Sequence, residues 1–188
     1  MTKIAIFASG GGSNAQEIIN HFQGNESVEI ALIVSNDTNS GVIVRAETHE
    51  IPFYILQKGE LEELEFSQVL EAMEIDFVVL AGFLKKIPSD IIEMYPNKIV
   101  NIHPALLPNY GGKGMYGSNV HKAVVAAGEK ESGMTIHFVN SNYDEGSIIE
   151  QQKTNILPSD TAEDCAKKVL ALEHKYFATC IERLVIEL

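Results

Sequence analysis

The sequence predicts a single α/β domain built on a mostly parallel, twisted sheet with helices on both faces. Three observations carry this prediction. Short apolar runs alternate along the chain with segments of helical spacing, as in successive βαβ units. The runs are nearly continuous rather than alternating, which is typical of parallel strands buried on both faces. The length of 188 residues also suits one domain, spanning 1–188, with its own core.

The first unit reads strand, loop, helix. Lys3–Ala8 is a β-rich apolar run, glycines 10–12 interrupt it, and Ser13 begins a segment with apolar residues at helical spacing as far as Phe22. The next elements alternate in the same way. They are strands at Val28–Ser35, Phe53–Leu56 and Phe77–Leu80, a short helix that follows a turn-rich segment and ends near Glu50, and an acidic amphipathic helix at Glu60–Met73.

The second half of the chain holds an unusually long connection. A helix at Ser89–Tyr95 leads to a strand at Lys98–His103, and Pro104–Gly117 is then rich in glycine and proline. Such a loop inside a compact domain is usually functional or disordered. The remaining elements are a helix at Ser118–Ala127, strands at Gly133–Val139 and Ser147–Thr154, and a last helix from Asp160 towards Glu187.

The net charge of the chain limits the classes of ligand that the protein is expected to bind. Lys and Arg number 14 and Asp and Glu 26, so the formal net charge is −12. An acidic balance disfavours nucleic acid and anionic membranes, whose binding depends on Lys and Arg, but it permits a small anion held by local amides. The N-terminal apolar run is too short for a secretory or membrane segment, so we expect a cytoplasmic protein. Cys165 and Cys180 lack the spacing of a disulfide framework or a zinc site.

The glycine loop between the first strand and the first helix has two interpretations. Free amides and the helix dipole favour a phosphate there, and Ser13 and Asn14 add side-chain donors. Gly10-x-Gly12-x-x-Ala15, with Asp37 further on, also fits the loose dinucleotide pattern. The simpler alternative is a tight turn with Ser13 as the N-cap.

Two polar residues end the strand at Lys98–His103. Asn101 and His103 are two apart, so they share a strand face at the carboxyl edge of the sheet, where the glycine loop also opens. Asn and His together suit an oxyanion at a carbonyl carbon. Asp144, in Asp-Glu-Gly, is either part of a simple turn or a carboxylate that orients His103 and favours its imidazolium form.

With these residues in view, the sequence resembles the folate-dependent formyltransferases over nearly its whole length. The resemblance rests on Ala8-Ser-Gly-Gly-Gly-Ser-Asn14, Leu80-Ala-Gly-Phe83, Asn101-Ile-His-Pro-Ala-Leu-Leu-Pro108, and Gly133-Met-Thr-Ile-His-Phe-Val139 followed by Asp144-Glu-Gly146. The Asn-x-His-Pro-x-Leu-Leu-Pro run is the specific signature among these. The resemblance implies the Rossmann-like fold of that family.

The resemblance also implies a set of site residues. The catalytic group falls on Asn101, His103 and Asp144, and Glu173 matches an acid that contacts the substrate's ribose. His137 is either a supporting residue or a buried strand histidine. The implied phosphate ligands are Gly12, Ser13 and Asn14. The implied folate pocket comprises Leu84, Lys85, Lys86, Ile87, Asn101, Asn140 and Asp144.

The implied activity is transfer of the formyl group of 10-formyltetrahydrofolate to the amine of glycinamide ribonucleotide, in purine synthesis. The expected partners are these small molecules, with no metal, no nucleic acid and no membrane, in a monomer or homodimer. A formyltetrahydrofolate deformylase, a methionyl-tRNA formyltransferase core and a dinucleotide-binding module remain as alternatives. The glycine loop argues against the first two, and both would need extra segments for which 188 residues leave no room.

Two departures from the family pattern stand out. A family arginine after the third strand has no clear counterpart, and Lys58 is the nearest substitute. The segment after Pro108 is longer and richer in glycine than in some relatives. It is either a flexible insertion or a lid that carries Lys113 towards an anionic substrate.

Overall fold

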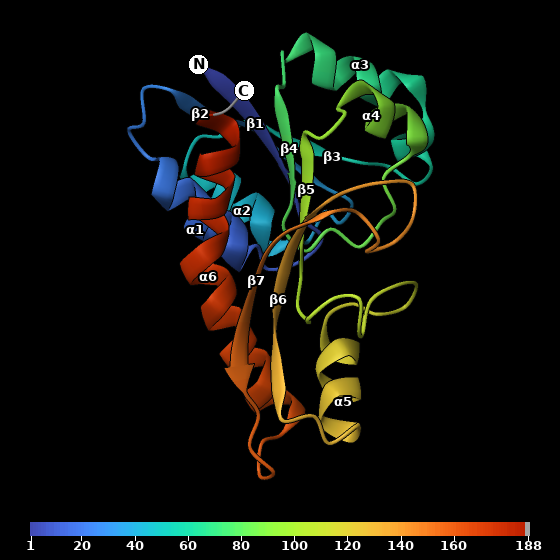
Figure 1. The fold of residues 1–188 in the computed structure, drawn as a ribbon. Helices are drawn as coiled ribbons and strands as arrows, with labels where there is room; N and C mark the ends of the chain where they lie inside the picture. The colour runs from blue at the N-terminus through green and yellow to red at the C-terminus, as the bar shows by residue number, and fades with distance from the viewer. Residues whose placement is uncertain (187–188) are drawn as a thin grey trace.

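The computed structural model describes residues 1–186, which form one seven-stranded sheet in the order β3-β2-β1-β4-β5-β6-β7 (Figure 1). β1 to β5 pair in parallel, whereas β6 and β7 are antiparallel to their neighbours. The prediction of a mostly parallel sheet is therefore confirmed. The strands are β1 Thr2–Phe7, β2 Val28–Ser35, β3 Phe53–Ile55, β4 Phe77–Leu80, β5 Ile99–His103, β6 Glu131–Phe138 and β7 Ile148–Asn155.

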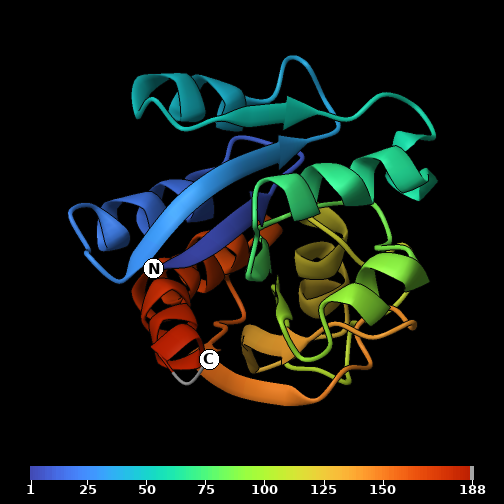
Figure 2. The ribbon, with the colours of Figure 1, turned by 90° about the horizontal axis from the view of Figure 1, so that it is seen from above.

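Helices cover both faces of this sheet, as Figure 2 shows from above. The helices are α1 Ser13–Phe22, α2 Gly41–Thr48, α3 Leu64–Ala72, α4 Ser89–Met94, α5 Ser118–Ala126 and α6 Ala162–Ile186, with a 3₁₀ turn at Glu60–Glu62. One hydrophobic cluster joins the sheet to α1, α2 and α6, and a second joins it to α3 and α4. Successive side chains of a strand point to opposite faces, so in β1 Ile4 and Ile6 enter the first cluster and Ala5 and Phe7 the second.

The strand order fixes where a ligand binds. Chain connections lead outward from β1 to β2 and β3 on one side and from β4 to β5 on the other, so the order reverses between β1 and β4. In open α/β sheets the loops at such a switch point diverge at the carboxyl edge and leave a crevice. The glycine loop after β1 and the Asn101–His103 pair of β5 both lie at this edge.

Two local predictions are wrong. The helix expected at Glu60–Met73 is split, because Glu63 is extended (φ −93°, ψ 145°) and the Glu60 carboxylate accepts the Gln57 amide. Ser13 is not the N-cap of α1. Gly12 is the N-cap, in the left-handed region (φ 69°), and no side chain caps the helix.

The last helix begins at Ala162, slightly later than the expected Asp160. The Thr161 hydroxyl accepts the Asp164 amide while the Asp164 carboxylate accepts the Thr161 amide, and this reciprocal cap fixes the start. The predicted end near Glu187 lies outside the described residues. Within residues 1–186, no helix combines the length and the hydropathy needed to cross a membrane.

Candidate active site

A cavity of about 690 Å³ lies at the carboxyl edge of the sheet, where the strand order reverses. Its floor comes from the ends of β1, β4 and β5, and one wall comes from α6 through Leu170 and Glu173. The long loop after β5 forms another wall, which includes Lys113. The cavity therefore brings together the glycine loop and the Asn101–His103 pair, which the sequence placed there separately.

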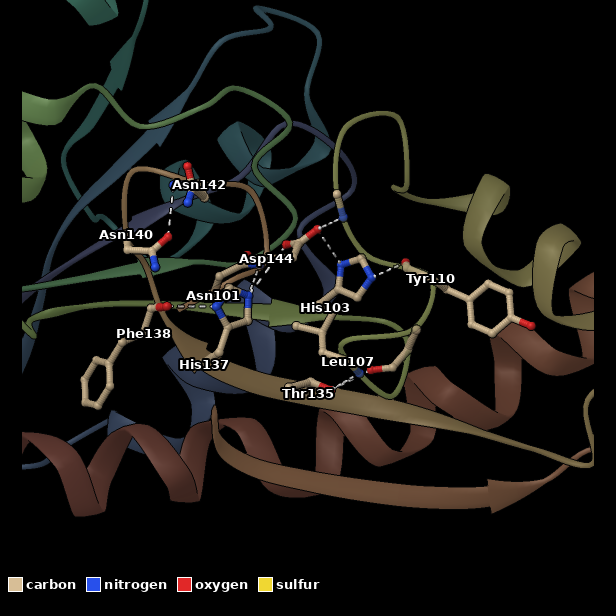
Figure 3. A network of polar contacts seen from close by, with 12 residues as sticks. Asn101, His103, Leu107, Tyr110, Thr135, His137, Phe138, Asn140, Asn142 and Asp144 are labelled. Atoms are coloured by element: carbon tan, nitrogen blue, oxygen red, sulfur yellow. Dashed lines mark hydrogen bonds and ion pairs between the residues drawn. The ribbon is translucent and has the colours of Figure 1, made fainter. Parts of the chain in front are cut away.

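Four polar side chains form a connected cluster in the cavity (Figure 3). The Asn101 amide nitrogen lies 3.0 Å from His137 Nε2. The Asp144 carboxylate stands between two rings, with Oδ1 3.6 Å from His137 Nε2 and Oδ2 3.6 Å from His103 Nδ1. Of the two interpretations of Asp144, the geometry is that of a carboxylate facing His103. His137, left open by the sequence, is in direct contact with this group.

His103 is anchored from its other side as well. Its Nε2 lies 2.8 Å from the backbone carbonyl oxygen of Tyr110. A carbonyl only accepts, so Nε2 carries the proton in the neutral ring and Nδ1 then presents a lone pair towards Asp144. No sequence pattern predicts this contact, because any residue can offer a backbone carbonyl.

Burial and nearby charges set the protonation states of His103 and Asp144. Burial lowers the pKa of His103 below its usual 6.5, and this outweighs the opposing effects of Asp144 and the Tyr110 carbonyl. Asp144 therefore favours the imidazolium form, as expected, but burial has the larger effect, so the neutral ring predominates at pH 7. Burial tends to raise the pKa of Asp144, but nearby His137 and His103 and the hydrogen bond from the Gly112 amide outweigh that and lower it, so Asp144 is ionised.

Backbone geometry holds Asp144 in place. Its φ of 57° is left-handed, a region that Asp tolerates better than most residues. Two residues later the chain passes so close to β6 that a Cβ on Gly146 would lie 1.7 Å from the Phe138 carbonyl oxygen. Only glycine fits there, so the Asp-Glu-Gly turn is a fixed support for the carboxylate.

The glycine loop presents donors to the same cavity. Within the described chain, the backbone amides of residues 10–14 donate to no protein group. They converge at the N-terminus of α1, where the helix dipole favours an anion. These features fit the phosphate interpretation of Gly12, Ser13 and Asn14.

Glu173 lies next to this loop. It is only 7% exposed, and its Oε2 accepts the Asn14 amide nitrogen at 2.6 Å. Burial raises the pKa of Glu173 to about 6, and the Asn14 hydrogen bond limits the increase. The acid that the resemblance assigned to the ribose is thus within contact of the residue assigned to the phosphate.

The residues assigned to folate also line the cavity. Leu84 is half exposed and Ile87 is buried, whereas the ammonium of Lys86 lies 5.8 Å from the centre of the Tyr143 ring. Lys85 and Asn140 line the cavity beside them. Lys58 is not among the residues that line the cavity, so the structure gives no support to it as a replacement for the family arginine.

The structure adds a residue that the sequence did not single out. His121 of α5 is buried, lines the cavity, and faces the thiol of Cys165 across 3.6 Å between Nδ1 and Sγ. Its position could have been inferred only from helix periodicity. Within residues 1–186, no three His, Cys, Asp or Glu side chains are grouped so that they could hold a metal ion.

Comparison with known proteins agrees with this geometry. A sequence profile of the family described as Formyl transferase matches residues 2–181. The chain belongs to the formyl transferase family. A Bacillus subtilis relative called phosphoribosylglycinamide formyltransferase is 34% identical, with 98% of this chain and 95% of that protein aligned.

Another member of the formyl transferase family, the chloroplastic phosphoribosylglycinamide formyltransferase of Arabidopsis thaliana, is 42% identical over 97% of this chain. The chain spans 66% of that protein's length. Among solved structures, a phosphoribosylglycinamide formyltransferase from Anaplasma phagocytophilum superimposes with a TM-score of 0.90 at 31% identity, covering 98% of this chain and 87% of that one. The formyl transferase fold therefore extends over nearly the whole chain.

Proposed function

We propose that this chain is a phosphoribosylglycinamide formyltransferase, which transfers a formyl group from 10-formyltetrahydrofolate to the amine of glycinamide ribonucleotide in purine synthesis. The observation that carries the proposal is the union, in one cavity, of an anion-binding helix N-terminus and the Asn101–His103–Asp144 cluster. Relatives called by this name over nearly the full chain support it.

The ribonucleotide fits the α1 side of the cavity. The free amides of the glycine loop, with Ser13 and Asn14, bind the phosphate. The Glu173 carboxylate has one oxygen bonded to Asn14, and its other oxygen accepts a ribose hydroxyl. Anchoring at these two points holds the glycinamide amine near His103, so much of the acceleration comes from orientation.

The formyl donor fits the part of the cavity that Leu84 and Tyr143 line. Leu84 and Tyr143 expose apolar surface to the cavity, at 50% and 41% exposure, which suits the flat rings of a folate. Lys85 and Lys86 offer cations for its carboxylates, and Asn101 and Asn140 offer polar groups at the rim of the pocket. The bound cosubstrate supplies the formyl carbon.

The polar cluster then acts on the transfer. Asn101 uses one amide hydrogen on His137 and offers the other to the oxyanion that forms when the amine attacks the formyl carbon. Neutral His103 takes the proton that leaves the amine, and Asp144 stabilises the imidazolium so formed. His103 returns the proton to the folate nitrogen as its bond to the formyl carbon breaks, which gives N-formylglycinamide ribonucleotide and tetrahydrofolate.

We further propose that 1–188 is one catalytic domain, that the protein works in the cytoplasm as a monomer or homodimer, and that its partners are small molecules. The net charge of −12 supports the exclusion of polyanions such as tRNA. The same negative charge argues against a methionyl-tRNA formyltransferase core, which would have to bind tRNA.

The test is a spectroscopic assay for tetrahydrofolate, run with glycinamide ribonucleotide present and absent. The proposal predicts product only when the ribonucleotide is present. Formation of tetrahydrofolate at the same rate without it would identify a deformylase instead. Titration with reduced nicotinamide cofactor is the second arm, and micromolar binding with no response to a folate analogue would identify a dinucleotide-binding module.

A further inference from the structure

The glycine loop rests on a segment of the chain that comes much later in the sequence. This backing segment, residues 36–45, includes the start of α2. The Ser40 hydroxyl donates to the Gly10 carbonyl at 2.7 Å, and the Val42 amide donates to the same oxygen at 3.2 Å. The Arg45 Nε donates to the Gly11 carbonyl at 2.8 Å. Both carbonyl groups of the loop are therefore turned towards the backing segment.

The contact is too close for side chains between the two backbones. A Cβ on Gly12, whose φ is 69°, would lie 2.7 Å from Val42 Cγ2. A Cβ on Gly41 would lie 3.1 Å from Gly11 Cα. The glycines thus allow the loop to lie directly on the backing segment, which fixes its orientation.

The orientation of the Gly10 and Gly11 carbonyl groups also determines the direction in which the loop's amide donors point. In a trans peptide the C=O and the following N–H point in opposite directions. When the Gly10 and Gly11 carbonyls point to the backing segment, the amides of Gly11 and Gly12 point away from it. These are among the amides with no protein acceptor in the described chain.

Arg45 differs from the other arginine in its partners. The chain has two arginines, and Arg183 is paired with the Glu150 carboxylate. Arg45 instead donates to two neutral groups, the Gly11 carbonyl and the Gln16 side-chain oxygen at 2.9 Å, and forms no ion pair within residues 1–186. In a chain with 26 acidic residues, this guanidinium is thus paired with no carboxylate in the described part and lies beside a loop whose amides are free.

We propose that Arg45 is a positioning residue for the phosphate of the substrate. It acts through the Gly11 carbonyl, which it holds so that the loop amides face the ligand, and its unpaired charge makes the loop more favourable for an anion. Gln16, held by Asn20 and His49 at 2.8 Å each, keeps the guanidinium in place. This inference rests on the proposed phosphate site and deepens it.

The test compares Arg45→Met and Arg45→Lys with Arg183→Met, which removes the same charge at a remote site. Steady-state kinetics give KM for glycinamide ribonucleotide and kcat, and calorimetry gives the Kd of ribose 5-phosphate, a probe that needs no turnover. Loss of a charged hydrogen bond predicts at least about a tenfold rise in both KM and Kd for Arg45→Met. Arg45→Lys, which keeps the charge, recovers part of the affinity. In all three variants kcat and folate-analogue binding stay within about twofold of the unmodified protein.

Two results would overturn the inference. One is an Arg45→Met protein with a lower melting temperature but an unchanged Kd for ribose 5-phosphate, which assigns Arg45 to stability alone. The other is an equal loss of phosphate affinity in Arg183→Met. If Arg45→Met does not fold, Arg45→Lys with unchanged Kd and KM decides against the role. If the unmodified protein does not formylate the ribonucleotide but the Kd difference holds, the proposed function fails and the positioning role stands.

Discussion

His103 Nδ1 lies 3.6 Å from Asp144 Oδ2, while His103 Nε2 is held by the Tyr110 carbonyl. Both side chains are largely buried, so their interaction is poorly screened. A proton that His103 gains during reaction enters the space facing Asp144 and meets an ionised carboxylate. The pair is therefore suited to hold a proton briefly and release it, rather than to keep His103 charged throughout.

Removing the charge of Asp144 tests this role. Asp144→Asn retains a residue that tolerates the left-handed backbone at φ 57°. We expect kcat to fall by at least about 100-fold, because the imidazolium loses its counter-ion. Asp144 raises the pKa of His103, so its loss moves the acid limb of the rate profile to lower pH. Measured kcat and kcat/KM against pH check both effects; an unchanged limb with near-normal kcat would exclude the pairing.

The buried carboxyl of Glu173 predicts a pH-dependent stability. Its pKa of about 6, above the usual 4.5, means that ionisation opposes folding. The contribution of the protonated Glu173 carboxyl to the free energy of unfolding is complete below about pH 4.5. It is lost as the pH rises through about 6. At about 1.4 kcal/mol per pH unit, the loss by pH 8 is about 2 kcal/mol.

Glu173→Gln removes this cost. Urea unfolding at pH 8 is expected to give a variant about 2 kcal/mol more stable than the unmodified protein, with no difference near pH 4.5, and a raised KM for the ribonucleotide. Glu17→Gln, on the neighbouring α1, serves as the control. Equal stability of the two proteins at pH 8 would contradict the burial argument.

A substitution at Gly146 tests whether the Asp-Glu-Gly turn holds the Asp144 carboxylate in position. An alanine Cβ there would meet the Phe138 carbonyl at 1.7 Å, so the turn must shift and take Asp144 with it. We expect Gly146→Ala to lose about 2 kcal/mol or more of stability and most of its activity. Gly128→Ala, where φ is 68° but no atom lies within 4 Å of the added Cβ, isolates backbone strain and should keep its activity. Thermal unfolding and kcat on both variants make the comparison.

Much of the site follows from local sequence rules. The two-residue spacing of Asn101 and His103 places both on one strand face, and the strand–glycine–helix pattern places free amides at the same edge. The fold follows from the alternating apolar runs. The pairing of Asp144 with His103 is different, since 41 residues separate them in the sequence; the residues left it as one of two interpretations, and the resemblance favoured it.

What could not be predicted depends on tertiary burial and backbone contacts. The lowered pKa of His103 could not be predicted, because desolvation outweighs the effect of Asp144 and the extent of burial is not visible in the sequence. The contact of Arg45 with the glycine loop joins residues 34 apart through a backbone carbonyl, which has no sequence signature. The break at Glu63 likewise reflects a local hydrogen bond of Glu60 that overrides helix propensity.

The most direct test of formyl transfer at this cavity follows the formyl carbon itself. The protein is incubated with glycinamide ribonucleotide and 10-formyltetrahydrofolate labelled isotopically in the formyl group, and the ribonucleotide is analysed by mass spectrometry over time. We predict labelled N-formylglycinamide ribonucleotide, formed about 100- to 1,000-fold more slowly by Asn101→Ala and at a normal rate by the remote control Asn155→Ala. Label that stays out of the ribonucleotide, or an Asn101→Ala protein as fast as the unmodified one, would contradict the assignment.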